Sequence, residues 1–315
     1  MAALNVIFMG TAELSCASLS ALLGDGRFRV VAVVTQPDKP KGRNLETEPS
    51  AVKVLALAAK LPVLQPVRAR DEQFPAQLRA FEPELIVVVA YGQILPPSIL
   101  DLPKHGCVNV HTSLLPKYRG AAPIQWAIAN GEAETGVTIM KMDAGLDTGA
   151  ILSQQRTPIT PEDNSATLHQ RLARLGAELL VETIPDYVSG KVQPVPQPAE
   201  GSTSAAKIKK EDGQIVWSQP AEQIWNRFRA FTPWPGAFTH WSGGNKSLLL
   251  KIRAAQVVER AGAPGEILQA DKEGIVVGCG QKALRILELQ REGGRSLPVR
   301  DFLTGNPLRQ GEKLR

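Results

Sequence analysis

Short, almost uninterrupted apolar runs alternate with helical patterns through the first part of the chain. The runs predicted as strands are Leu4–Met9, Phe28–Thr35, Leu85–Ala90 and Gly106–Val110, and the predicted helices are Glu13–Leu23, Ser50–Lys60, Glu72–Phe81 and Pro123–Ala129. Apolar strands that are separated by helices pair in parallel and are covered on both faces. The sequence therefore predicts an α/β domain with a doubly wound, mostly parallel sheet.

The composition changes after residue 185, where Gly, Ser, Gln and Pro become frequent. Pro194, Pro196 and Pro198 alternate as in a stiff, extended linker. Beyond it the patterns indicate a helix at Ala221–Phe231 and strands at Leu248–Ile252, Ala263–Gln269, Gly274–Val277 and Ala283–Leu289. At 315 residues the chain is long enough for two cores. We therefore expect a larger domain at 1–185, a linker at 186–206 and a smaller C-terminal β-barrel domain at 207–315.

Several classes of protein are made improbable by what the sequence lacks. Its N-terminal residues show no secretory signal pattern and no apolar run is long enough to span a membrane, so a cytoplasmic protein is expected. The three cysteines are far apart and form no CxxC pair, which argues against a disulfide framework and against a zinc site. No G-x-G-x-x-G or Walker sequence occurs, so no dinucleotide cofactor is expected. No second ligand or carboxylate stands at useful spacing from His105, His169 or His240, so no metal is expected.

Charge is divided unevenly between the two parts of the chain. Residues 1–206 hold 18 Lys and Arg against 20 Asp and Glu, whereas residues 207–315 hold 18 against 11, a net charge of +7. Lys and Arg that neutralise phosphates release counterions and so provide affinity that does not depend on sequence. The excess, which includes Lys207, Lys209 and Lys210 just after the linker, favours a polyanionic partner, although it is also compatible with a simply basic surface.

An amide, an imidazole and a carboxylate stand where a catalytic centre is expected. In an extended backbone Asn109 and His111 project to the same face, and the glycines near Asp147 allow the loop after the next strand, Thr138–Met142, to return that carboxylate to them. Asn109 could bind an oxygen that becomes negative, while His111 and Asp147 handle a proton. Such a set suits acyl or formyl transfer to a nitrogen nucleophile.

The same residues belong to a larger set of motifs. The chain resembles the 10-formyltetrahydrofolate-dependent formyltransferases almost from end to end. The segments that carry the resemblance are Gln36–Arg43, Val88–Pro96, Asn109–Val–His111, Ser113–Pro116, Arg119–Gln125, Glu134–Met140, Asp143–Gly149 and Arg229–Gly236. Within the family the similarity is greatest to members that act on methionine esterified to initiator tRNA.

The resemblance implies a function and a set of site residues. Asn109, His111 and Asp147 would be catalytic in residues 1–185, and 10-formyltetrahydrofolate would be the formyl donor without a metal. The residues implied to bind the folate are Ser113, Leu114, Leu115, Pro116, Val89, Ala90, Tyr91 and Asp143. Initiator Met-tRNA would be the acceptor, contacted by Arg43 and, through the basic domain 207–315, by Lys207, Lys209 and Lys210.

Two other interpretations stay open at this point. A formyltransferase that acts on a small amine, such as an amino sugar nucleotide or glycinamide ribonucleotide, would share the same three catalytic groups. A non-catalytic RNA-binding protein with an inactive folate fold would not need them. Covalent catalysis by Ser113 is disfavoured, because this residue is not in a G-x-S-x-G turn.

Overall fold

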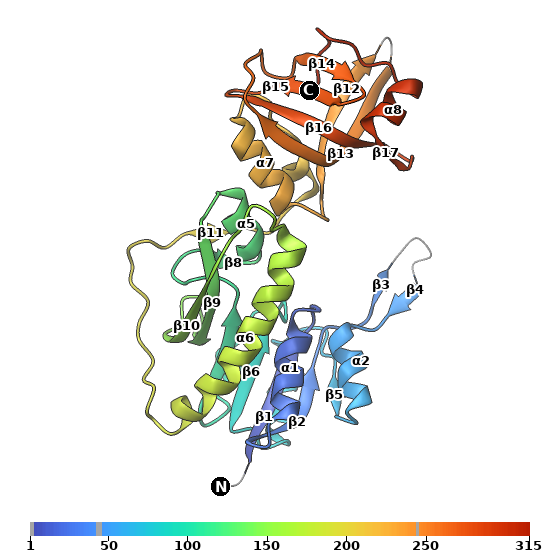
Figure 1. Cartoon of the computed structure of the whole chain (residues 1–315). Coiled ribbons are helices and arrows are strands. Elements are labelled where there is room, and N and C mark those ends of the chain that lie inside the picture. Colours follow the sequence, from blue (N-terminus) through green and yellow to red (C-terminus); the bar gives the residue numbers. More distant parts are fainter. Residues whose placement is uncertain (1–2, 42–45, 244–245) are drawn as a thin grey trace. The chain divides into compact units, whose positions relative to one another are not determined.

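The computed structural model describes residues 3–41, 46–243 and 246–315 (Figure 1). The chain folds into two compact units. Unit 1 comprises residues 1–123, 134–158 and 168–205, and unit 2 comprises 124–133, 159–167 and 206–315. The second unit therefore includes two short segments that precede the linker in the sequence.

Unit 1 is built on a seven-stranded mixed sheet with the order β10-β9-β7-β6-β1-β2-β5. The strands are β1 (Leu4–Gly10), β2 (Phe28–Val34), β5 (Val63–Leu64), β6 (Leu85–Val89), β7 (Cys107–His111), β9 (Glu134–Lys141) and β10 (Ile151–Pro158). The first five of these run parallel to one another, while β9 and β10 are antiparallel. Leu4–Met9, Phe28–Thr35, Leu85–Ala90 and Gly106–Val110 are confirmed as strands to within a residue at each end, as is the mostly parallel α/β sheet. The start of the strand predicted at Thr138–Met142 was wrong, because its pairing with β10 extends back to Glu134.

Helices accompany the parallel strands as the alternating pattern predicts. They are α1 (Ser15–Gly24), α2 (Ala51–Ala58), α3 (Phe74–Arg79), α4 (Pro97–Leu100), α5 (Pro123–Ala129) and α6 (Ser165–Val188). Two small ladders complete the strands, β3 (Lys39–Lys41) with β4 (Glu46–Glu48) and β8 (Arg119–Gly120) with β11 (Ser204–Ala205). The sequence analysis did not predict α6, whose apolar stripe is interrupted by Gly176 and Pro185.

One face of β7 is covered by α6. A Cβ atom on Gly176 would lie only 2.8 Å from Cγ1 of Val110, so the absence of a side chain at Gly176 lets α6 pack directly against the strand (Figure 1). Because side chains alternate along a strand, Asn109 and His111 point to the other face. The packing of α6 thus decides which face of the sheet carries the polar groups.

Unit 2 is a small antiparallel barrel. Its strands are β12 (Ala237–Gly243), β13 (Lys246–Val258), β14 (Ile267–Asp271), β15 (Gly274–Gly278), β16 (Ala283–Arg291) and β17 (Ser296–Pro298), and its helices are η1 (Lys210–Gly213), α7 (Ala221–Ala230) and α8 (Val299–Gly305). The sheet order is β12-β13-β16-β15-β14, with β17 paired to β16. The prediction that a strand begins at Ala263 was wrong, because the amide of Glu266 donates to the carbonyl of Ala263 in a turn before β14.

The C-terminal residues close this sheet. His240 in β12 exchanges two backbone hydrogen bonds of 2.8 Å with Arg315, and the amide of Leu314 donates to the carbonyl of Gly265 next to β14. The last residues thus connect the two edge strands, which removes both open edges. Trp217 and Phe302 are buried in the enclosed core. The predicted small C-terminal barrel is confirmed.

Candidate active site

Asn109 and His111 lie at the carboxyl end of β7 and are both buried, with 8% and 5% of their surface exposed. Nε2 of His111 is 2.9 Å from the carbonyl oxygen of Tyr118. A carbonyl can only accept, so Nε2 must carry the hydrogen in this contact. Nδ1, on the opposite side of the ring, is therefore the nitrogen that can exchange a proton with a neighbouring group.

That group is Asp147. Its Oδ2 lies 3.6 Å from Nδ1 of His111 and accepts a hydrogen bond of 2.8 Å from the amide of Gly120. Its Oδ1 lies 3.4 Å from Nδ2 of Asn109. The three side chains that the sequence analysis singled out are thus brought together, with the carboxylate between the amide and the imidazole. An imidazole held by a carbonyl on one nitrogen and a carboxylate on the other is oriented to hold or pass a proton at Nδ1.

The loop that carries Asp147 is sharply folded. It leaves β9 beside the start of β7, where the amide of Met142 donates to the carbonyl of Cys107, and then returns along the polar face. A Cβ atom on Gly149 would lie 1.9 Å from the carbonyl oxygen of Lys141, so only glycine fits there. Asp147 itself has φ of 54°, a left-handed conformation that aspartate tolerates better than most residues. The predicted return of the loop is what the structure shows.

Asp143, which was predicted to contact folate, orders this loop from within. Its Oδ1 accepts hydrogen bonds from the amide of Gly145 at 3.0 Å and from the hydroxyl of Thr148 at 2.7 Å. The side chain of Asp143 is exposed, unlike the catalytic candidates. Its contacts therefore indicate a role in shaping the loop beside Asp147.

The segment Ser113–Pro116 follows β7 directly and is held by internal hydrogen bonds. The Ser113 hydroxyl is buried and donates to the carbonyl of Lys117 at 2.6 Å. The amide of Leu115 donates to the Thr138 hydroxyl at 3.1 Å, and its carbonyl accepts from Gln154 at 2.9 Å. A buried hydroxyl that already donates to a carbonyl is poorly placed to act as a nucleophile. The segment offers a folate mainly its shape and its apolar atoms.

Val89 is the last residue of the neighbouring parallel strand, β6, and Ala90 and Tyr91 follow it, so the segment lies at the edge of the sheet where β7 also ends. Ala90 has φ of 44°, which turns the chain away from the sheet. The phenol of Tyr91 is buried, and this burial raises its pKa to about 12, while its carbonyl accepts from Gln36. The side chain of Tyr91 thus packs in the core, whereas Ala90 is exposed.

The linker contributes contacts that the sequence analysis missed. Nε2 of Gln197 donates to the carbonyl oxygens of Asp147 and Gly149, each at 2.8 Å, and its Oε1 accepts from Nε and Nη2 of Arg119 at 3.0 and 2.7 Å. Farther along, the amide of Arg119 donates to the carbonyl of Thr203. These residues belong to unit 1, so the end of the linker forms one wall of the site. A glutamine in a polar, proline-rich stretch carries no periodic signal that could have revealed this.

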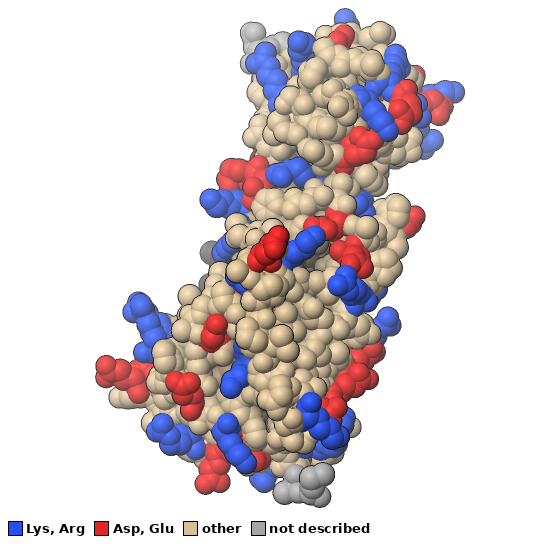
Figure 2. Space-filling view, turned by 90° about the vertical axis from the view of Figure 1, so that its left-hand side faces the viewer, with Lys and Arg blue, Asp and Glu red and all other residues tan. Residues whose placement is uncertain are grey.

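The predicted tRNA contacts are placed only in part. Lys207, Lys209 and Lys210 are exposed at the start of unit 2. Arg43 lies outside the described residues. Nearby in sequence, Asp38 forms a salt bridge of 2.5 Å with Lys53, and this contact lowers the pKa of the Asp38 carboxyl. On the face in Figure 2, Lys and Arg are interspersed with Asp and Glu, so charge alone defines no continuous basic patch there.

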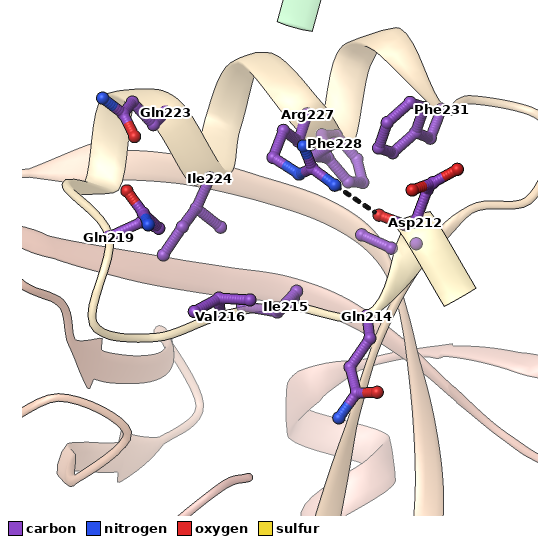
Figure 3. A pocket seen from close by; sticks show the side chains of 12 residues that line it. Asp212, Gln214, Ile215, Val216, Gln219, Gln223, Ile224, Arg227, Phe228 and Phe231 are labelled. Carbon is purple, nitrogen blue, oxygen red and sulfur yellow. Dashed lines mark hydrogen bonds between the residues drawn. The ribbon is translucent and has the colours of Figure 1, made fainter. Parts of the chain in front are cut away.

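A cavity of about 280 Å³ is lined by residues that all belong to unit 2. It is enclosed between α7 and residues 212–216, where Arg227 donates to the carbonyl of Asp212 at 2.9 Å and its guanidinium lies over the ring of Phe231 (Figure 3). None of the predicted site residues lines it. The cavity therefore does not locate the candidate active site, which is identified by the contacts among Asn109, His111 and Asp147.

The described residues contain no group of three or more His, Cys, Asp or Glu side chains arranged to bind a metal. In that same part of the chain no helix is both long and apolar enough to cross a membrane.

Comparison with known proteins gives a consistent result over the whole chain. The family described as formyl transferase matches residues 4–184, and the formyl transferase C-terminal domain matches residues 207–307. The chain is 51% identical over 311 residues to methionyl-tRNA formyltransferase of Myxococcus xanthus, covering 98% of this chain and 97% of that protein. It is 48% identical over 314 residues to the Geobacter sulfurreducens protein of the same name, covering 100% and 98%.

Solved structures share the fold at lower identity. WlaRD, a sugar 3N-formyl transferase, aligns with a TM-score of 0.65 at 19% identity and covers 92% of this chain and 98% of that chain. HypX from Aquifex aeolicus in complex with tetrahydrofolic acid aligns with a TM-score of 0.63 at 17% identity, over 100% of this chain and 51% of that chain.

A mixed α/β sheet that presents an Asn–His–Asp cluster, followed by a small barrel, defines a group-transfer enzyme. The chain belongs to the formyltransferase family, and its activity is transfer of a one-carbon formyl group. The interpretation as a non-catalytic RNA-binding protein was wrong.

Proposed function

We propose that this formyltransferase transfers the formyl group of 10-formyltetrahydrofolate to the amino group of methionine esterified to initiator tRNA, in the cytoplasm, for translation initiation. The observation that carries the proposal is the intact Asn109–His111–Asp147 cluster in a chain about half identical, over both domains, to relatives named for this activity. Residues 1–185 would be the catalytic domain, 186–206 the linker and 207–315 the tRNA-binding domain.

The cluster supports a direct transfer without a covalent enzyme intermediate. The methionine amine attacks the formyl carbon, and the new C–N bond forms while the carbonyl oxygen becomes negative. The amide of Asn109 and the imidazole of His111 stabilise that oxygen. When the bond to N10 of the folate breaks, the proton lost by the amine is passed to N10 through His111 and Asp147. Tetrahydrofolate and formylated Met-tRNA are the products.

The donor would lie against the loops that follow β6, β7 and β9. Ser113–Pro116, Val89–Tyr91 and Asp143 are proposed to border it. Two large apolar side chains in these loops are exposed, Ile94 at 78% and Leu146 at 63%. A flat, aromatic ligand such as the pterin and benzoyl groups of folate would cover such side chains. The exposure of these two side chains, in loops that border the Asn109–His111–Asp147 cluster, supports the assignment of the folate site.

Lys207, Lys209 and Lys210 are proposed to contact tRNA phosphates, which gives a testable prediction. Replacing all three with alanine should reduce the slope of log affinity against log salt by about 2 to 3 and weaken tRNA binding about 10-fold or more at moderate salt. Filter binding over a salt series measures both quantities.

The control removes three exposed basic groups elsewhere in unit 2, Lys272, Arg295 and Arg309, each replaced by alanine. If both triple variants weaken binding equally, only the overall charge matters and the local assignment fails. Folate binding should be unchanged in both.

Arg43 is proposed to contact the acceptor end of tRNA, and Arg43→Ala should impair formylation while sparing hydrolysis of the folate donor.

The acceptor is tested by incubating the purified protein with 10-formyltetrahydrofolate and, separately, charged initiator tRNA, glycinamide ribonucleotide and an amino sugar nucleotide. Formylation of Met-tRNA at a kcat/KM far above that of the small amines supports the proposal. Preference for a small amine would overturn it in favour of the alternative formyltransferase activity.

A further inference from the structure

Gln197 uses every hydrogen-bonding position of its amide at the candidate active site. Its NH₂ group donates to the carbonyl oxygens of Asp147 and Gly149, while its oxygen accepts two bonds from Arg119. A guanidinium only donates and carbonyls only accept, so this amide has one possible orientation. Arg119 therefore fixes the amide of Gln197, and the amide in turn fixes the backbone on both sides of Thr148.

We propose that Gln197 is a positioning residue for Asp147, through which the linker holds the carboxylate in its reactive place. The inference rests on the proposed function, because it assigns Asp147 its role in formyl transfer. Asp147 has a left-handed backbone, a conformation that persists only when surrounding contacts enforce it. One of the two bonds that Gln197 donates goes to the carbonyl of this same residue, and the other goes to the carbonyl of Gly149.

The remaining contacts of the loop do not replace this restraint. Asp143 bonds within the loop, to Gly145 and Thr148, and so shapes the loop without attaching it to the rest of the unit. The backbone amide of Gly120 and the side-chain amide of Asn109 hold the carboxylate of Asp147, but not its backbone. Without Gln197 the loop could shift while keeping its internal bonds, and a small shift would separate Oδ2 from Nδ1 of His111.

The segment that carries Gln197 is itself fixed to the site. The amide of Tyr118 donates to the Thr203 hydroxyl at 2.8 Å, and the amide of Ala121 donates to the carbonyl of Ala205 at 2.8 Å. A Cβ atom on Gly120 would lie 2.7 Å from the carbonyl oxygen of Ala205, so the two segments are in close contact. The end of the linker is thus a rigid support for Gln197.

Gln197→Glu is the most direct test. The carboxylate still accepts from Arg119 but loses both N–H groups and places an oxygen against two carbonyl oxygens. Turnover should fall about 10-fold to 100-fold, because a small misplacement of a reacting group costs up to about 100-fold, with KM for both substrates within about twofold. Gln197→Ala should give a similar loss. The matched control is Gln193→Glu, which changes an exposed glutamine of the same linker whose side chain donates to the nearby Gly190 carbonyl, and this variant should have normal turnover.

A double-mutant cycle separates positioning from a general structural effect. If Gln197 acts through Asp147, Gln197→Ala should cause little further loss in an Asp147→Asn background. Losses that multiply in the double variant, or normal turnover of Gln197→Ala alone, would overturn the proposal.

The positioning role of Gln197 can also be tested by NMR spectroscopy, in an experiment that needs no tRNA acceptor. The chain has four histidines, so ¹⁵N-histidine spectra are simple, and the His111 signal is identified by its loss in His111→Gln. Gln197→Glu should shift the His111 Nδ1 resonance and leave the other three unchanged. An unshifted His111 resonance in Gln197→Glu would refute the positioning role. If the resonance shifts but the unsubstituted protein does not formylate Met-tRNA, only the proposed acceptor is refuted.

Discussion

Replacing His111 with alanine is expected to lower formyl-transfer turnover at least about 100-fold, because the imidazole acts on charge and protons that develop only in the transition state. Binding of the folate should change much less, since its proposed contacts lie in the loops around the cluster. Single-turnover kinetics with charged tRNA measure the first quantity, and fluorescence titration with a stable folate analogue measures the second.

His111 is buried, so its replacement by alanine also removes the imidazole N–H that the Tyr118 carbonyl accepts. His111→Gln is therefore the second variant, because its amide can still donate to that carbonyl but cannot take up a proton. It should remain as inactive as His111→Ala. His105, which precedes β7 at the opposite end of the strand, provides the control, and His105→Ala should keep wild-type turnover. Substantial activity in His111→Gln would show that this residue is structural.

Replacing Asp147 with asparagine is expected to lower turnover by a similar factor, about 100-fold, while the fold is retained. Asparagine tolerates the left-handed backbone as well as aspartate does, and its oxygen can still accept from the amide of Gly120. What is lost is the negative charge beside Nδ1 of His111, which orients the ring and stabilises the positive charge that develops on it in the transition state. Steady-state kinetics and a thermal unfolding scan test the two parts of this prediction.

His111 and Asp147 should act together in the same step of the reaction. A protein with both His111→Gln and Asp147→Asn is expected to be little slower than either single variant, because groups that act together on one proton are strongly non-additive. Independent, multiplied losses would show that Asp147 stabilises the reaction without acting through the imidazole. Near-normal turnover in Asp147→Asn alone would remove it from the catalytic cluster.

Much of this site could be predicted because it depends on local patterns. The apolar runs located β1, β2, β6 and β7 to within a residue, and the period of two along β7 placed Asn109 and His111 on one face. The glycines around Asp147 correctly indicated a tight return. The long helix α6 escaped prediction because Gly176 and Pro185 interrupt its apolar stripe, yet Gly176 is what allows the helix to pack on Val110.

By itself the sequence determined most strand and helix segments of unit 1, the family and the three groups that are proposed to perform the chemistry, because strand alternation and motif spacing are properties of neighbouring residues. Only the tertiary structure decided what holds those groups in place. Gln197 and Asp147 are 50 positions apart, and the C-terminal residues that close the barrel pair with strands far from them in sequence. Contacts of this kind are fixed when the sheet and the barrel close and the remaining backbone donors and acceptors must find partners, and no local pattern records which partners those will be.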